Sequence, residues 1–292
     1  MRKIILGTDW GLDCDDVVAV RILARAHKQG RIKLCGVVIN HFLENSVASL
    51  DGFLESEGIH ALPLGIDRSI TSGEGKYQAH LAKRAVSYSS NDDAEDGIRL
   101  YRRLLAESDG KVEIAEIGFL QALAGLIQSK PDDISDKSGV ELMREKVDKL
   151  WIMAGKWDDE IGKEYNFNYN PITRAAASVV CALAPVPITF LGFEIGVDVI
   201  SGSKLDADDV LYIAMVDHGS VNGRSSWDPM LALLAVNGSE EDSGYSIVHG
   251  RASADAKSGD NTFVRDENGP HAYVVRKFAP EYYADAIDGF IK

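Results

Sequence analysis

Short runs of apolar residues alternate along the chain with segments whose apolar positions recur at helical spacing. This alternation predicts an α/β fold, a mostly parallel, open, Rossmann-like sheet with helices on both faces. We expect one domain over residues 1–292, because no linker or low-complexity tract interrupts the pattern. The predicted strands cover residues 4–6, 34–39, 61–64, 112–117, 150–153 and 188–191, the predicted helices 17–28, 45–57, 97–106, 121–128, 173–184 and 280–291, and strands with turns 246–276.

Polar or glycine residues follow several of these predicted strands directly. Asp9 follows the first strand, Asn40 the second, and Gly118 and Gly155 two later ones. In open parallel sheets, ligands bind beyond the carboxyl ends of the strands. The pattern therefore predicts a ligand site along this edge of the sheet.

The first of these strand ends carries a dense acidic segment, residues 7–16, with Asp9, Asp13, Asp15 and Asp16 placed before a predicted helix. Carboxylates this close raise one another's pKa unless a positive charge compensates them. A hard divalent cation with oxygen ligands is the simplest compensation. The alternative is an acidic helix start with one Asp as N-cap, which explains one or two of the four residues. The segment therefore predicts a metal or catalytic role.

Composition narrows the class of partner. The chain carries a net charge of −14 and has no basic run longer than two residues, so binding to nucleic acid is disfavoured. Three cysteines indicate a reducing, cytoplasmic setting rather than a disulfide scaffold. No apolar run reaches the roughly 20 residues that cross a bilayer, so no membrane partner is expected. A small-molecule substrate and a bound cation fit this composition.

The order of motifs resembles that of the nucleoside hydrolases, calcium enzymes that cut the N-glycosidic bond of ribonucleosides. Residues 3–16 resemble the motif DxDPGxDDAxA, and residues 114–120 are similar to the strand that ends in TGPLTN. Residues 151–155 look like the MGG strand, and residues 164–166 with Pro171 look like EFN…DP. Trp227-Asp228-Pro229 lies where the family often has HDP. The resemblance implies the nucleoside hydrolase fold and a homodimer or homotetramer active in nucleoside salvage.

The same resemblance implies roles for individual residues. Asp9 would bind calcium and act as general base toward the attacking water, and Asp16 would also ligate the metal. The carbonyl of Ile117 and the carboxylate of Asp228 would complete the protein ligands. The remaining residues would hold ribose hydroxyls or water, or line the sugar pocket, namely Asp15, Asn40, Met153, Glu164 and Asn166.

Two departures from the family pattern concern the chemistry. Two extra residues separate Asp9 from the Asp15-Asp16 pair, so Asp13 could replace one of the assigned metal ligands. Trp227 replaces the histidine that protonates the leaving base in many members, and an indole can stack on a heterocycle but donates no proton usefully. His218 is the best candidate for a replacement acid, and the alternative is a surface loop histidine. Residues 69–96 and 217–226 could form loops over the site.

The first functional hypothesis is calcium-dependent hydrolysis of ribonucleosides, or of a related ribosyl compound, to ribose and free base. Water activated at Asp9 would attack through an oxocarbenium-like transition state. One alternative is a non-catalytic, calcium-dependent ribose- or nucleoside-binding protein, suggested by Trp227. A second is a magnesium-dependent phosphohydrolase that uses the same carboxylates, although the chain lacks a DxDxT-type nucleophile motif and a phosphate-cradling lysine.

Overall fold

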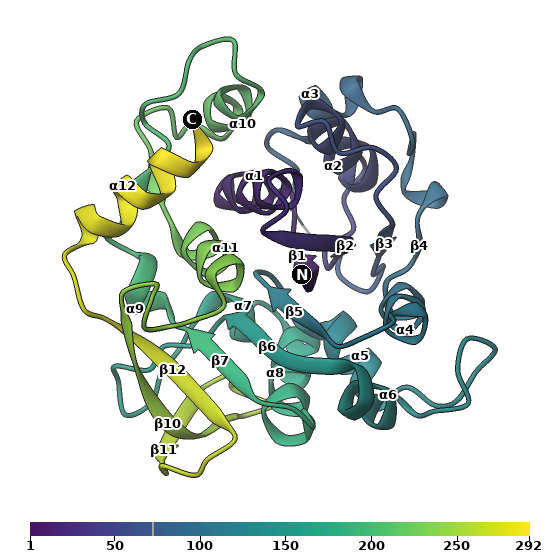
Figure 1. Cartoon of the computed structure of the whole chain (residues 1–292), viewed down its shortest axis with the longest axis vertical. Coiled ribbons are helices and arrows are strands. Elements are labelled where there is room, and N and C mark those ends of the chain that lie inside the picture. Colours follow the sequence, from purple (N-terminus) through teal and green to yellow (C-terminus); the bar gives the residue numbers. More distant parts are fainter. Residues whose placement is uncertain (72) are drawn as a thin grey trace.

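The computed structural model describes residues 1–71 and 73–292, and within them ten strands form one sheet in the order β11-β10-β12-β7-β6-β5-β1-β2-β3-β4 (Figure 1). Every neighbouring pair from β12 to β4 is parallel, whereas β10 runs antiparallel to β12 and to β11. The strands are β1 (Arg2–Thr8), β2 (Ile32–Ile39), β3 (Leu64–Ile66), β4 (Glu95–Asp96), β5 (Val112–Glu116), β6 (Val147–Met153), β7 (Ile188–Leu191), β10 (Tyr245–Ala254), β11 (Asn261–Arg265) and β12 (His271–Arg276), with β8 (Ile200–Ser201) and β9 (Arg224–Ser225) as a separate pair.

Helices cover both faces of this sheet (Figure 1). One layer consists of α1 (Asp15–Lys28), α2 (Ser46–Ser56), α11 (Trp227–Asn237) and α12 (Pro280–Ile291), and the other of α4 (Gly97–Glu107), α5 (Gln121–Gln128), α6 (Gly139–Lys146) and α8 (Pro171–Leu183). The shorter helices are α3 (Gln78–Leu81), η1 (Ala82–Arg84), η2 (Asn91–Asp93), α7 (Tyr165–Asn168), α9 (Phe193–Gly196) and α10 (Val210–His218).

The two-residue period of the strands places successive side chains in different cores. Ile4 and Leu6 of β1 pack in the core beneath α1 and α11, and Ile5 packs in the core beneath α4 and α5. All three side chains are fully buried. A strand covered on both faces reads as a continuous apolar run, as parallel strands usually do. The predicted α/β fold with a mostly parallel sheet is therefore confirmed.

Several boundaries differ from those that the pattern predicts. The strand predicted over residues 61–64 begins only at Leu64, because Pro63 has no N–H for the ladder and contributes its carbonyl to Val37 instead. Helix α6 was not predicted, although Ser138 and Glu141 form a capping box at its start. Within residues 69–96 the sequence pattern predicts a helix over residues 77–86, and the structure forms the shorter α3 and η1 there. Ser72 of this segment lies outside the described residues.

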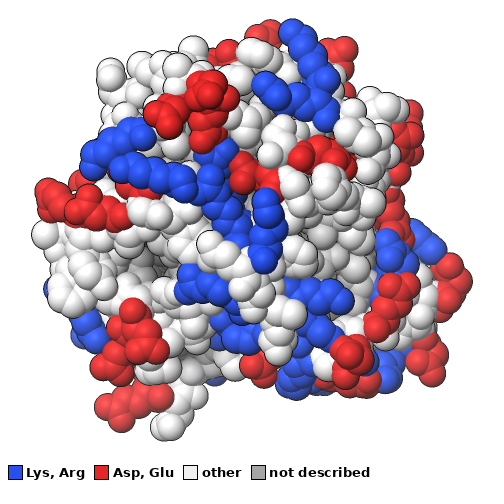
Figure 2. Space-filling view, turned by 45° about the horizontal axis from the view of Figure 1, so that its top comes forward, with Lys and Arg blue, Asp and Glu red and all other residues white. Residues whose placement is uncertain are grey.

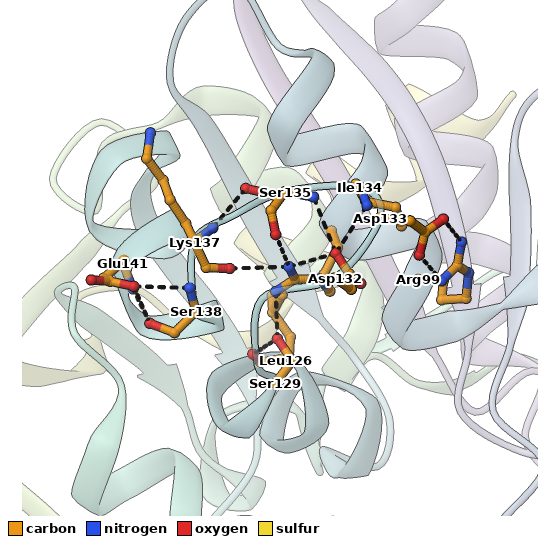
Figure 3. Close-up of polar contacts among 11 residues, drawn as sticks. Arg99, Leu126, Ser129, Asp132, Asp133, Ile134, Ser135, Lys137, Ser138 and Glu141 are labelled. Atoms are coloured by element: carbon orange, nitrogen blue, oxygen red, sulfur yellow. Dashed lines mark hydrogen bonds and ion pairs between the residues drawn. The ribbon is translucent and has the colours of Figure 1, made fainter.

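The segment between α5 and α6 is held by polar contacts, which Figure 3 shows in detail. Asp132 accepts hydrogen bonds from the backbone N–H groups of Ile134 and Ser135, at 3.1 Å each. The exposed pair Arg99–Asp133 closes at 2.8 Å. The segment lies at the far side of α6 in Figure 1 and lines none of the cavity described below.

The surface carries both signs of charge. Figure 2 shows basic side chains interspersed with acidic and uncharged ones over the face drawn. In the part of the chain that the structure describes, no helix combines the length and the apolar character needed to span a bilayer.

Candidate active site

A cavity of about 380 Å³ opens at the carboxyl end of the sheet, next to the neighbouring strands β1 and β5. The chain proceeds from β1 to β2 on one side and returns with β5 on the other, so the cavity lies at the switch point of the strand order. Fourteen residues line it: Asp9, Leu12, Asp13, Asp15, Asp16, Ile117, Met153, Glu164, Tyr165, Asn166, Phe193, Arg224, Trp227 and Asp228.

The acidic loop between β1 and α1 is fixed from behind by side chains of other elements. Gly11 adopts a φ of +120°, and its N–H donates to the Tyr77 hydroxyl at 2.9 Å. The same hydroxyl donates to the carbonyl of Asp13 at 2.8 Å. Trp10 is fully buried and donates its indole N–H to Ser49 at 2.7 Å. The loop therefore presents its carboxylates to the cavity on a rigid support.

Asp15, Asp16 and Asp228 form a compact carboxylate cluster, which we call the acidic triad. Each offers a carboxylate oxygen within 4.8 Å of the other two, and all three side chains are buried. Asp15 and Asp16 lie in the first turn of α1, and Asp228 lies in the first turn of α11. Burial, and then repulsion from neighbouring carboxylates that include Asp9 and Asp13, raises the pKa of each carboxyl well above its usual value. Buried oxygens with uncompensated charge suit a hard divalent cation.

Asp9 lies beside this triad, directly after β1. Burial, with added repulsion from Asp13 and Glu164, raises its pKa to about 7. Glu164 caps α7 and accepts hydrogen bonds from the backbone N–H groups of Asn166 at 2.7 Å, Gly155 at 3.0 Å and Phe167 at 3.2 Å. Its pKa is also raised to about 7, because its burial outweighs these hydrogen bonds. A carboxylate with a pKa near 7 is suited to accept a proton at neutral pH.

Asp13 belongs to a different polar group from the acidic triad. Arg224 donates to both of its carboxylate oxygens, with the shortest contact at 2.5 Å, and His218 Nε2 lies 3.5 Å away. Burial opposes ionisation of Asp13, but Arg224 holds the pKa of this carboxyl below its usual value. Asp13, Cys14 and His218 also bring their donor atoms within 4.8 Å of one another. Asp13 therefore lines the cavity as the partner of Arg224.

Aromatic side chains form another part of the cavity wall. Trp227 stacks on Phe193, with ring centroids 5.4 Å apart and an interplanar angle of 26°. Its indole N–H donates to the carbonyl of Phe193 at 2.8 Å. Tyr165 lines the cavity as well, and Asn166 donates to the carbonyl of Met153 at 3.1 Å. The wall offers flat apolar surface for a heterocycle.

Two of the residues predicted for the site do not line the cavity. Asn40 is fully buried and donates through Nδ2 to Glu116 at 3.0 Å. His218 makes a 2.8 Å hydrogen bond with Ser220 through Nδ1. Burial lowers the pKa of His218, so its imidazole is neutral at pH 7. The other predicted residues, Asp9, Asp13, Asp15, Asp16, Ile117, Met153, Glu164, Asn166, Trp227 and Asp228, all line the cavity together.

Sequence reasoning assigned no site role to Leu12, Tyr165 or Phe193, which the structure adds to the cavity wall. Phe193 follows the end of β7 by two residues, so the strand-end rule used for Asp9 could have identified it. Tyr165 adjoins Glu164 in the motif that resembles EFN. Leu12 carries no signal of its own, because only the fold of the acidic loop directs it to the cavity.

Comparison with known proteins gives structural matches alone. No family model matches the sequence, and no curated protein does. An inosine-uridine preferring nucleoside hydrolase from Bacillus anthracis is 15% identical with a TM-score of 0.68, over 100% of this chain and 99% of that chain. The plant nucleoside hydrolase PpNRh1 is 15% identical with a TM-score of 0.73, over 99% and 98% of the two chains.

A third similar structure is the type III effector protein XopQ complexed with adenosine diphosphate ribose. It is 16% identical, with a TM-score of 0.67 over 100% of this chain and 93% of that chain. Two of these three structures are nucleoside hydrolases, and each aligns along nearly its whole length with this chain. The chain therefore has the fold of the nucleoside hydrolases.

Proposed function

We propose that this chain is a calcium-dependent N-ribosyl hydrolase that cleaves ribonucleosides, or a related ribosyl compound, to ribose and a free base. The observation that carries the proposal is the acidic triad, buried beside Asp9 in a cavity at the sheet's switch point. The shared fold supports this proposal. A fold alone does not define a reaction, but a fold together with a matching site limits the reactions that are possible.

The donor set fits calcium. Asp15, Asp16 and Asp228 supply buried carboxylate oxygens, and Asp9 and the carbonyl of Ile117 are further candidates at the same cavity. Which of Asp9, Asp13, Asp15 and Asp16 ligate the ion is part of the proposal. When bound, the ion would neutralise these charges and lower the pKa of the attacking water.

The other steps of the proposed reaction would depend on side chains of the cavity. Asp9 would accept the proton of the attacking water, since its carboxylate is buried and has a pKa of about 7. Glu164 and Asn166 would orient ribose hydroxyls, with Met153 against the sugar. The surrounding carboxylates would stabilise the positive charge that develops on the sugar as the glycosidic bond breaks. The base would lie against Phe193 and Trp227.

The test is direct. The purified protein is incubated with calcium and a panel of purine and pyrimidine ribonucleosides, and the reducing sugar released is measured. We expect the wild type to release sugar and a chelator to abolish this release. The Asp9→Ala variant should remain folded but release no sugar. Normal turnover by Asp9→Ala would refute the proposed role of Asp9. Phosphate release from sugar phosphates, without release of base from nucleosides, would favour the magnesium phosphohydrolase instead.

A second candidate is a calcium-dependent ribosyl-binding protein without catalysis. It is favoured by Trp227, whose only N–H donor is engaged by Phe193, and by the ADP-ribose complex of the similar effector structure. Calorimetric titration with nucleosides and ADP-ribose separates the two candidates. Tight binding with no product after long incubation would support binding alone.

We further propose that the protein acts in the cytoplasm as a homodimer or homotetramer, with no nucleic-acid or membrane partner. The proposal rests on the resemblance to nucleoside hydrolases and on the sparse cysteines. Light scattering coupled to size-exclusion chromatography measures the assembly, and a monomeric mass at micromolar concentration would refute it.

A further inference from the structure

Apart from the carboxyl groups that the proposed mechanism assigns to the cation, the attacking water and the ribose, the described side chains that line the cavity include no free acidic group for a leaving base. Trp227 donates its indole N–H to Phe193 O at 2.8 Å. Asn166 donates to Met153, and Glu164 accepts three backbone N–H bonds. The hydroxyl of Tyr165 remains, but a phenol is a weak acid with an ordinary pKa near 10, and partial burial raises the pKa of this one further. A neutral heterocycle would therefore leave without help from a general acid, which is typically worth 10²–10⁴-fold in rate.

The same cavity has many more carboxyl groups than cationic groups. Six carboxyl side chains and a single arginine are among the described residues that line it. Asp13 neutralises Arg224 through hydrogen bonds to both carboxylate oxygens. Five carboxyl groups remain, which is more than the two charges that one divalent ion would balance, and a further cation in the cavity would favour their ionised forms. The cavity therefore attracts a cationic substrate and repels an anionic one.

Trp227 shows that the aromatic wall tolerates a neighbouring cation. The guanidinium carbon of Arg224 lies 5.4 Å from the centroid of the Trp227 ring, within the range of cation–π contacts. Phe193 stacks on Trp227 and lines the same cavity. A positively charged heterocycle in this cavity would therefore be close to both aromatic rings and carboxyl groups.

We propose that the preferred substrates of this site are N-ribosides whose leaving heterocycle is already cationic, such as pyridinium or N7-alkylated purine ribosides. The inference rests on the proposed hydrolase function. The C–N bond breaks with its electron pair going to the ring nitrogen, so the cationic ring leaves as a neutral base. Water forms the new C–O bond, and its proton passes to Asp9 and then to solvent. The base takes up no proton.

Charge also moves in the favourable direction during this reaction. In the ground state the positive charge lies on the heterocycle, and in the transition state it moves to the ribose ring. If the sugar lies against Asp9 and Glu164 as proposed, the charge approaches these carboxylates as the bond breaks. Interactions that strengthen toward the transition state raise the rate rather than merely tighten binding.

The experiment compares three substrates with calcium at pH 6, after subtraction of the uncatalysed rate. They are guanosine, its cationic counterpart 7-methylguanosine, and 4-nitrophenyl riboside, which is neutral but needs no proton to leave. We expect kcat/KM for 7-methylguanosine to exceed that for guanosine by about 100-fold or more, the lower range of general acid catalysis. Equal values for these two would overturn the inference. Silence with all three, nitrophenyl riboside included, would refute the hydrolase function itself.

Variants distinguish the effect of the missing general acid from the effect of the charge in the cavity. Trp227→His adds a side chain that can donate a proton, so guanosine hydrolysis should rise about tenfold relative to 7-methylguanosine. Trp227→Phe keeps an aromatic face without a donor and should keep the preference of the wild type. Turnover of nitrophenyl riboside reports that each variant is folded and competent. The proposal fails if the Trp227→His and Trp227→Phe variants have the same ratio of kcat/KM for guanosine to kcat/KM for 7-methylguanosine.

Asp13→Asn tests the charge, because it leaves the positive charge of Arg224 uncompensated in the cavity. We expect kcat/KM for 7-methylguanosine to fall at least tenfold more than that for nitrophenyl riboside. Asp133→Asn makes the same change of charge in the segment between α5 and α6, outside the cavity, and should leave the ratio unchanged. An equal fall for both substrates in Asp13→Asn would contradict selection by charge.

Discussion

Asp9 owes its position to the absence of a side chain at Gly118. A Cβ built on Gly118 would lie 2.3 Å from the backbone nitrogen of Asp9 and 2.8 Å from its Cβ. Gly118→Ala should therefore displace the backbone that carries Asp9, lower the free energy of unfolding by about 1–3 kcal/mol, and reduce kcat/KM. Thermal unfolding and nucleoside hydrolysis measure the two effects.

Gly110→Ala is the matched control for this substitution. A Cβ on Gly110 meets nothing within 4 Å, so its unfolding temperature and activity should remain close to those of the wild type. Equal stability and activity of the two alanine variants would show that Asp9 does not depend on the close approach of Gly118.

The carboxylate of Asp9 should matter through its charge rather than its volume. Asp9→Asn keeps the size and removes the proton acceptor, so kcat should fall by about 10²–10⁴-fold. The substitution also relieves repulsion with Asp13 and Glu164, so the chelated protein should be at least as stable as the wild type. Single-turnover hydrolysis and thermal unfolding in chelator test this pair of effects. A variant that is both active and destabilised would contradict the assignment.

Strands and helices differ in how far the apolar pattern predicted them. Ile4, Ile5 and Leu6 form a continuous apolar run, which is typical of a strand buried on both faces. Helix α11 was not predicted, because Met230, Leu231 and Leu234 belong to a segment that is apolar on nearly every side and has no amphipathic period. Its burial between the sheet and α1 depends on the tertiary fold.

A site residue could be predicted where its side chain simply follows the end of a strand. It could not be predicted where a residue of another strand binds that side chain and keeps it out of the cavity. Asp9 follows β1 and lines the cavity. Asn40 follows β2 as well, but buried Glu116 on β5 binds its amide. This contact depends on the pairing of β5 with β1, and the pattern of a single sequence does not reveal which strands pair. The pairing of Asp13 with Arg224 spans 211 positions and was hidden for the same reason.

Strand β12, which lies between β10 and β7 in the sheet, contains a buried histidine that should make stability sensitive to acid. His271 on β12 accepts the backbone N–H of Ala252 at 2.9 Å, and burial lowers its pKa to about 4. Its contribution to stability is complete above the unfolded pKa near 6.5 and is lost as pH falls through about 4. Between these values the free energy of unfolding should fall by up to about 1.4 kcal/mol per pH unit from this group.

His271→Asn keeps an acceptor for Ala252 without a titrating ring, so its unfolding should lose this component of the slope. Urea denaturation between pH 4 and 7 measures the difference from the wild type. His249 is exposed on the neighbouring strand β10, and His249→Asn is the control that should retain the slope. Identical slopes for the wild type and His271→Asn would show that the buried ring does not titrate as expected.

At the scale of the whole molecule, the acidic triad should couple metal binding to folding, if it holds the cation as proposed. Asp15, Asp16 and Asp228 have pKa values raised by burial and by repulsion from neighbouring carboxylates. Without a cation, their contribution to stability is complete below their unfolded pKa near 4 and is lost as pH rises through the folded values. The chelated protein should therefore lose stability from this cluster as pH increases.

Calcium should reverse that trend, because it binds the ionised carboxylates of the folded chain. A calcium concentration of 100 times Kd adds about 2.7 kcal/mol to the free energy of unfolding. Since protons compete for the same oxygens, the increment in Tm that calcium gives over chelator should be larger at pH 8 than at pH 5. Asp16→Asn should lose most of the increment, whereas Asp133→Asn should keep it. An increment independent of pH, or preserved in Asp16→Asn, would place the stabilising ion outside the acidic triad.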